Sequence, residues 1–143
     1  MKLDYRIFII AVLIVIVVII VISKLIYLFS QRTKSHDIEK RWKELQKLLA
    51  KKTNWGKAIN QADILLDETL KIKHFKGKTT GERLVSAQHK LTANDMVWYS
   101  HKLHNKLIYE PNTKISKSVV TKCLLGYWKA LKDLGVFNKQ DEQ

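Results

Sequence analysis

The segment Tyr99–Glu110, YSHKLHNKLIYE, places two imidazoles and an amide within little more than one helical turn. Histidine is the side chain that most readily exchanges a proton near neutral pH, and its ring nitrogens also bind transition metals. His101, His104 and Asn105 could therefore form a proton-transfer site, a metal site or a polar network inside a helical core.

A helical projection places these side chains on the inner face of their helix. At about 100° per residue, five side chains fall within about 60° of His101: Val97, Trp98, His104, Asn105 and Ile108. Lys102, Lys106 and Tyr99 face the other way. We predict that the helix is mostly buried. A buried imidazole or amide without a partner costs about 1–3 kcal/mol, so these groups must be hydrogen-bonded or open onto a cleft.

Three other kinds of site fit the sequence less well. Zinc requires three or four ligands, and neither an HExxH motif nor a cysteine pair accompanies the two histidines. Cys123 falls in an apolar stripe and is expected in the core rather than as a nucleophile. The GKTT segment at 77–80 resembles a phosphate-binding loop, but position 72, where that motif requires glycine, is Ile72. We expect no catalytic residue, metal ion or cofactor.

The segment HKLHNKLIYE at 101–110 resembles a degenerate form of the HEPN motif, which is often written HKxRNxxxHE. Trp55, QADILLDETL at 61–70, TTGERL at 79–84 and the spacing of Trp98, His101 and Lys102 also resemble uncharacterised bacterial proteins that often carry an N-terminal membrane span. The likeness covers roughly residues 54–134.

The resemblance implies a helical bundle, commonly a dimer. Many HEPN domains are metal-independent ribonucleases, in which arginine steadies the phosphate and histidine transfers the proton, and others are inactive and serve in binding or assembly. Here the arginine position is His104 and the histidine position is Tyr109, while only Asn105 and Glu110 keep their types. An imidazole lacks a permanent charge, and a tyrosine with its usual pKa of about 10 is a poor proton shuttle.

The resemblance therefore implies a non-catalytic polar motif that could serve in binding, made of His101, His104, Asn105, Tyr109 and Glu110. A membrane-tethered HEPN-type ribonuclease or RNA-binding protein is the alternative. In that case His104 would act as the base, and Lys102 or Lys106 would hold the phosphate, although both lysines project from the opposite face of the helix.

The elements that position this motif are all helical by their apolar spacing. Helices are expected at about 37–51, 54–73, 79–91, 92–110 and 116–134, with Ser35 and Thr79 as N-caps and Gly135 as a left-handed stop. Glu82, three residues after Thr79, completes a capping box. The expected fold is all-α: one N-terminal transmembrane helix followed by a compact bundle of about five helices.

The N-terminus carries a long apolar run. Ile7–Phe29 is broken only by Ser23 and Lys24 and spans about 34 Å as a helix, enough to cross a bilayer. Val21–Lys24 lacks the small residues of a signal-peptide cleavage site, which favours an uncleaved anchor. Basic residues are more numerous after the run than before it, so the positive-inside rule predicts a single-pass protein of the plasma (inner) membrane, with its N-terminus outside and its C-terminal domain cytoplasmic.

The expected organisation is an anchor at 1–31, a basic juxtamembrane helix at 32–53, a HEPN-like bundle at 54–136 and a polar tail at 137–143. Setting aside Lys2, Arg6, Lys24 and Asp4 from the 26 basic and 13 acidic residues leaves 23 and 12, a formal charge of +11. Such a charge attracts anionic lipid headgroups or RNA. The membrane is therefore the expected partner, a homodimer and RNA are further candidates, and the sequence indicates no small-molecule substrate.

Overall fold

The computed structural model describes residues 2–137, and this range contains five α-helices and three short 3-10 segments. The α-helices are α1 (Lys2–Lys47), α2 (Trp55–Ile72), α3 (Thr80–Ala87), α4 (Asn94–Tyr109) and α5 (Lys117–Asp133). The 3-10 segments are η1 (Leu48–Ala50), η2 (Lys52–Asn54) and η3 (Gln88–Lys90). No strand occurs in the described range, so the predicted all-α class is confirmed, as are the N-terminal apolar helix and the bundle that follows it.

The apolar run lies in the first of two compact units, residues 1–33. Its large apolar side chains are exposed from Tyr5 to Phe29. The helix contains a window that is long and apolar enough to cross a membrane, and none of that window is buried. Ser23 Oγ donates to the Ile19 carbonyl at 2.8 Å, so this hydroxyl is satisfied within the helix, as a hydrocarbon environment requires.

α1 does not stop after the apolar run but continues to Lys47. The predicted helix start with an N-cap at Ser35 is therefore wrong. The physical reason is that residues 30–47 contain neither glycine nor proline to end the helix. Thr33 does not interrupt it either, because its hydroxyl donates back to the Phe29 carbonyl at 3.1 Å.

The last part of α1 belongs to the second compact unit, residues 34–143. Ile38, Trp42 and Leu45 are buried in the core of that unit. Arg41 Nη2 also donates to Glu68 Oε1 of α2 at 3.0 Å. Residues 34–47 thus pack into the bundle, whereas the sequence interpretation separated 32–53 from it. Residues 138–143 of the expected polar tail lie outside the described range.

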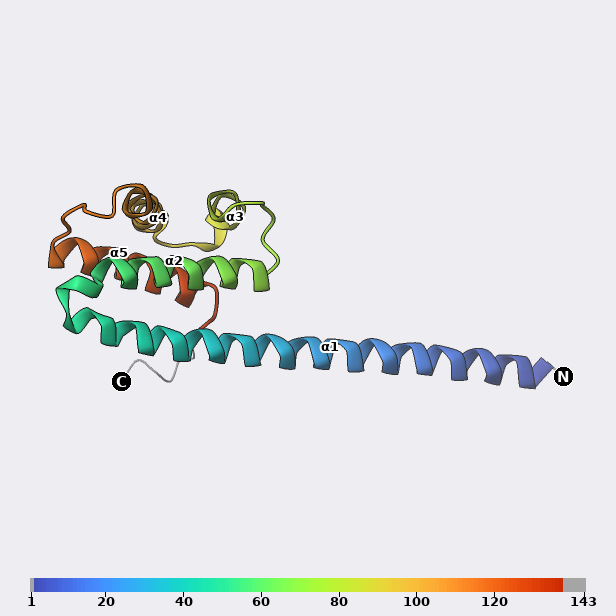
Figure 1. Cartoon of the computed structure of the whole chain (residues 1–143). Coiled ribbons are helices and arrows are strands. Elements are labelled where there is room, and N and C mark those ends of the chain that lie inside the picture. Colours follow the sequence, from blue (N-terminus) through green and yellow to red (C-terminus); the bar gives the residue numbers. More distant parts are fainter. Residues whose placement is uncertain (1, 138–143) are drawn as a thin grey trace. The chain divides into compact units, whose positions relative to one another are not determined.

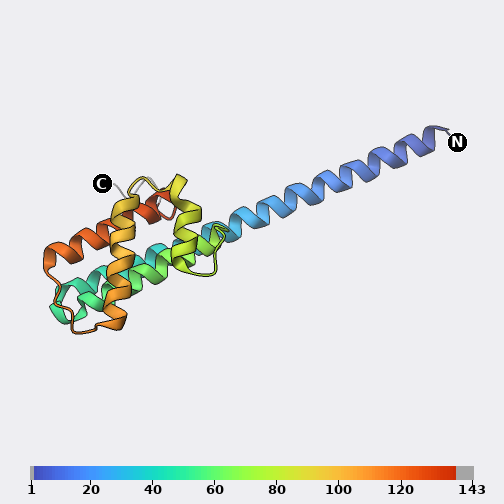
Figure 2. The same ribbon diagram turned by 90° about the horizontal axis from the view of Figure 1, so that it is seen from above.

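The bundle of this unit has three layers (Figures 1 and 2). α2 and α5 lie side by side, α3 and α4 cross one of their faces, and the last part of α1 covers the other. α4 and α5 approach each other closely at Gly126, where an added Cβ would lie 2.9 Å from the Met96 carbonyl oxygen and from Ser100 Oγ. Only glycine fits at this crossing.

Capping interactions at helix ends stabilise the turn before α3 and the turn after α5. Thr79 Oγ1 accepts from the Glu82 amide, as predicted, while the Glu82 carboxylate accepts from the Lys78 amide at 2.7 Å, one residue before the cap. Gly135 has the predicted left-handed backbone, with φ +74°, and the amides of Gly135 and Val136 close a Schellman motif on Lys132 and Leu131.

Candidate functional site: a buried carboxylate–histidine network

α4 crosses the bundle and brings the polar residues singled out in the sequence to its centre. His101 and His104 are buried, as predicted, and Lys102, Lys106 and Tyr99 are exposed, as predicted. The end of the helix differs from the prediction. Asn105 and Ile108 are exposed rather than interior.

Two further motif residues, Tyr109 and Glu110, are also exposed, and Tyr109 is 85% accessible. The reason for the difference is that a helical projection gives a direction but not the point at which the neighbouring helices end. The last turn of α4 has too little of the bundle beside it to cover its inner face. The five motif residues therefore divide into two buried histidines and three exposed side chains.

The two histidines meet a carboxylate from α2. Asp63, 4% exposed, lies with Oδ1 at 2.8 Å from His101 Nδ1 and at 3.0 Å from the Tyr127 hydroxyl of α5, which donates to it. Its other oxygen, Oδ2, lies 3.4 Å from His104 Nε2. One carboxylate thus connects α2, α4 and α5, and we call Asp63, His101, His104 and Tyr127 the Asp63 network.

The partners of His101 define its tautomer. A carboxylate can only accept, so Nδ1 carries the proton and donates to Asp63. The other ring nitrogen, Nε2, lies 3.3 Å from Asn105 Nδ2, which donates to it. Both ring nitrogens of His101 are thereby used inside the protein. The ring also contacts Trp98 edge-on and stacks on His104, with centroids 6.1 Å apart in each case.

Burial governs the protonation of the other two members of the network. The pKa of His104 is lowered, mainly because burial penalises the charged ring and also because His101 lies beside it, although Asp63 acts in the opposite direction. The pKa of the Tyr127 hydroxyl is raised far above its ordinary value by burial and then by the Asp63 charge. At neutral pH, Tyr127 is therefore a proton donor and His104 is neutral.

Sequence reasoning missed Asp63 and the role of Tyr127. Tyr127 belongs to the apolar stripe of α5 and is fully buried, but its hydroxyl partner was not inferred. Asp63 gave a usable signal. It follows Ile59 by four residues and precedes Leu66 by three, so an ionisable side chain stands in the apolar stripe of α2. A carboxylate in such a stripe needs a buried partner.

Other chemistry finds little support in the described range. Within residues 2–137, no three His, Cys, Asp or Glu side chains are arranged to hold a metal ion. Cys123 is a buried free cysteine, as predicted, and burial raises the pKa of its thiol, which disfavours the reactive thiolate. The segment before Thr79 follows α2 and closes onto Arg83, which donates to the Gly77 carbonyl at 2.6 Å and to Asp67.

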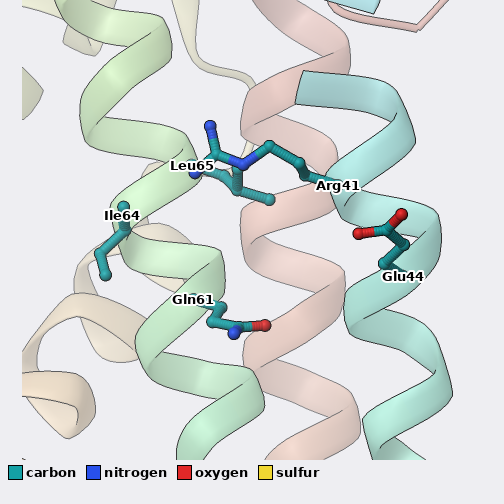
Figure 3. A pocket seen from close by; sticks show the side chains of 5 residues that line it. All are labelled: Arg41, Glu44, Gln61, Ile64 and Leu65. Carbon is teal, nitrogen blue, oxygen red and sulfur yellow. The ribbon is translucent and has the colours of Figure 1, made fainter. Parts of the chain in front are cut away.

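Hollows in the described part of the chain lie beside α2. One lies between α1 and α2, has a volume of about 250 Å³ and is lined by Arg41, Glu44, Gln61, Ile64 and Leu65 (Figure 3). The guanidinium of Arg41 is already engaged by Glu68. Another lies between the start of α2 and the end of α4, has a volume of about 380 Å³, and has His104 among its lining residues.

Comparisons with protein-family models, with curated proteins and with solved structures found no match to this chain. The features of the described chain that bear on function are the apolar part of α1, the Asp63 network and the exposed surface around it.

Proposed function

We propose that this protein is a single-pass membrane protein whose cytoplasmic, HEPN-like helical domain is not catalytic and acts by binding or self-association. The observation that carries the proposal is the engagement of His101. A general base needs a free ring nitrogen within reach of a substrate proton, and here Asp63 and Asn105 occupy both nitrogens.

Anchoring is supported by the first unit. A core helix of a soluble protein is mostly buried, whereas none of the apolar window of α1 is buried in the chain. Basic side chains follow the window at positions 24, 32, 34, 40, 41 and 43, and only Lys2 and Arg6 precede it. This asymmetry supports a cytoplasmic bundle.

Insertion can be tested with the full-length protein in sealed inside-out membrane vesicles. Protease added outside the vesicles should digest the bundle, while intact right-side-out cells should protect it. The same membranes washed with carbonate should retain the protein. Release by carbonate, or digestion of the bundle on intact cells, would contradict the anchoring or its orientation.

Association is supported by the exposed apolar side chains at the end of α4. Ile108 and Tyr109 are 57% and 85% exposed, and Ile64 on α2 is also exposed. A second chain that covered them would remove apolar area from water. Ile108→Lys should shift a detergent-solubilised dimer toward monomer in sedimentation velocity, whereas Val85→Lys, at an exposed residue of α3, should not. A wild-type monomer at all concentrations would exclude self-association but not binding of another partner.

The ribonuclease alternative makes a different prediction. In the form predicted from the sequence it needs Lys102 or Lys106 beside His104, but both lysines are exposed while His104 is buried, and Lys106 is directed toward Glu110 at 3.8 Å. Purified full-length protein should leave a labelled single-stranded RNA intact. Cleavage that disappears in His104→Ala and persists in Lys90→Ala would establish the enzyme and refute the proposal.

A further inference from the structure

The hollow between the start of α2 and the end of α4 combines an apolar rim with polar groups. Leu107, Ile108 and Pro111 line one part of it, and Lys57, Asn60 and His104 line the other. Ile108 is more than half exposed, so the rim is open to solvent. The hollow therefore offers an apolar contact and a positive charge to the same ligand.

His104 stands out among these groups. It is 8% exposed, and no described residue forms a hydrogen bond with either of its ring nitrogens. Its nearest charged neighbour is Asp63, at 3.4 Å from Nε2. Neither ring nitrogen belongs to the fully buried polar atoms without a partner, so the ring can present a nitrogen to a ligand in the hollow.

The first turn of α2 adds a second source of positive potential. α2 begins at Trp55, and the side chain of its N-cap, Asn54, forms no capping hydrogen bond. Gly56 and Lys57 of that turn line the hollow. A helix N-terminus carries about half a positive charge, and an anion placed there is stabilised.

The charges limit what the ligand can be. Lys57 is cationic, and His104 becomes cationic when it gains a proton, but Asp63 lies beneath it and cancels one of these charges. His101 is held by Asp63 and Asn105, and Tyr127 donates to Asp63, so neither is directed to the hollow. With His104 protonated the net charge is near +1, which matches a monoanion better than a phosphate dianion.

We propose that this hollow binds a small organic monoanion, a carboxylate attached to an apolar body. Lys57 and the first turn of α2 face the carboxylate, the protonated ring of His104 donates a hydrogen bond to it, and Leu107 and Ile108 contact the apolar body. The inference deepens the proposed binding role by naming a ligand class. It is independent of membrane insertion, and it shares Ile108 with the proposed self-association surface.

The test is a titration of the full-length protein in detergent with sodium hexanoate, followed by the imidazole NMR signals of His104. Hexanoate should bind saturably at millimolar concentration, and more tightly at pH 6 than at pH 8, because the anion favours the protonated ring. Acetate, which lacks the apolar body, and hexanamide, which lacks the charge, should each bind at least about fivefold more weakly.

Variants of the lining residues measure how much each one contributes to hexanoate binding. His104→Gln should weaken hexanoate binding about tenfold and abolish its pH dependence, as read from the Gly56 amide signal. Lys57→Ala should weaken it by about two- to fivefold, whereas Lys90→Ala, a matched change at an exposed lysine of η3, should not. Ile108→Ser keeps the charged groups, and it should weaken the binding of hexanoate but not the binding of acetate. The test therefore stands even if His104→Gln folds poorly.

Three results would overturn the inference: no saturable shift with hexanoate, equal binding of hexanamide, or tighter binding of inorganic phosphate than of hexanoate. Each would leave the vesicle and sedimentation results unaffected, so failure of the hollow as a site is distinguishable from failure of the proposed function.

Discussion

Removing the Asp63 carboxylate tests whether the network connects the three helices as described. In Asp63→Ala, the His101 Nδ1–H and the Tyr127 hydroxyl both lose their acceptor while remaining buried. Two hydrogen-bond donors are orphaned, and each costs about 1–3 kcal/mol. We expect the free energy of unfolding of residues 34–143, a compact unit, to fall by about 2–6 kcal/mol.

The assay is urea unfolding of that unit, followed by circular dichroism at 222 nm. With an m value of about 2 kcal/mol/M, the midpoint should fall by about 2 M. Glu44→Ala, at an exposed carboxylate of α1, should change the free energy of unfolding by less than about 0.5 kcal/mol. The comparison distinguishes loss of a buried acceptor from loss of any negative charge.

A double-mutant cycle measures the coupling between Asp63 and Tyr127 directly. Tyr127→Phe removes a donor without orphaning another and should cost about 1.5–3 kcal/mol. In that background Asp63→Ala should cost less than it does in the wild type, by about 1–3 kcal/mol, because one orphaned donor is gone. A cost below about 1 kcal/mol for Asp63→Ala, or additivity of the two changes within about 0.5 kcal/mol, would refute the network.

The other predictions concern packing, pH and thiol chemistry. Gly126→Ala should lower the free energy of unfolding by about 1–3 kcal/mol, because the added Cβ would lie 2.9 Å from the Met96 carbonyl oxygen. Gly56→Ala meets open space and should raise it by about 0.5–1 kcal/mol. Urea unfolding midpoints measure both changes. Because the pKa of His104 is lowered in the folded state, the unfolded chain takes up this proton at a higher pH than the folded chain does. The free energy of unfolding should therefore fall by up to about 1.4 kcal/mol per pH unit as the pH drops below about 6.5. It should level off below the pKa of His104 in the folded state. His104→Gln should flatten this slope in urea titrations, and an unchanged slope would assign it to another group. Cys123 should react with an aromatic disulfide reagent only after unfolding, and a fast native reaction would contradict its burial.

The helices were predictable because each buried face repeats with the period of an α-helix. The stripe of α5 from Val120 to Leu131 is buried, and Gly135 ends the helix as its conformational freedom requires. The continuity of α1 was not predicted, because Ser35 is a good N-cap that the chain does not use. Capping residues permit a helix start but do not impose one where the helix can continue on both sides.

The candidate site was predictable only in part. The period of α4 placed His101 and His104 inside correctly, but it also placed Asn105 and Ile108 inside, because a projection contains no information about where the neighbours end. The partner of the histidines, Asp63, lies 38 residues before His101 in the chain. Whether Asp63 meets the two histidines depends on how α2, α4 and α5 pack against one another, and local periodicity does not specify this packing.

The most direct measurement of the central claim is the nitrogen-15 NMR spectrum of the His101 ring at pH 7.5. We expect a proton on Nδ1, protected from exchange with water by the bond to Asp63, and an unprotonated Nε2. In Asp63→Ala this protection should be lost. A proton on Nε2, or an Nδ1 proton that exchanges as fast as that of an exposed histidine, would contradict the claim that His101 is committed to the bundle.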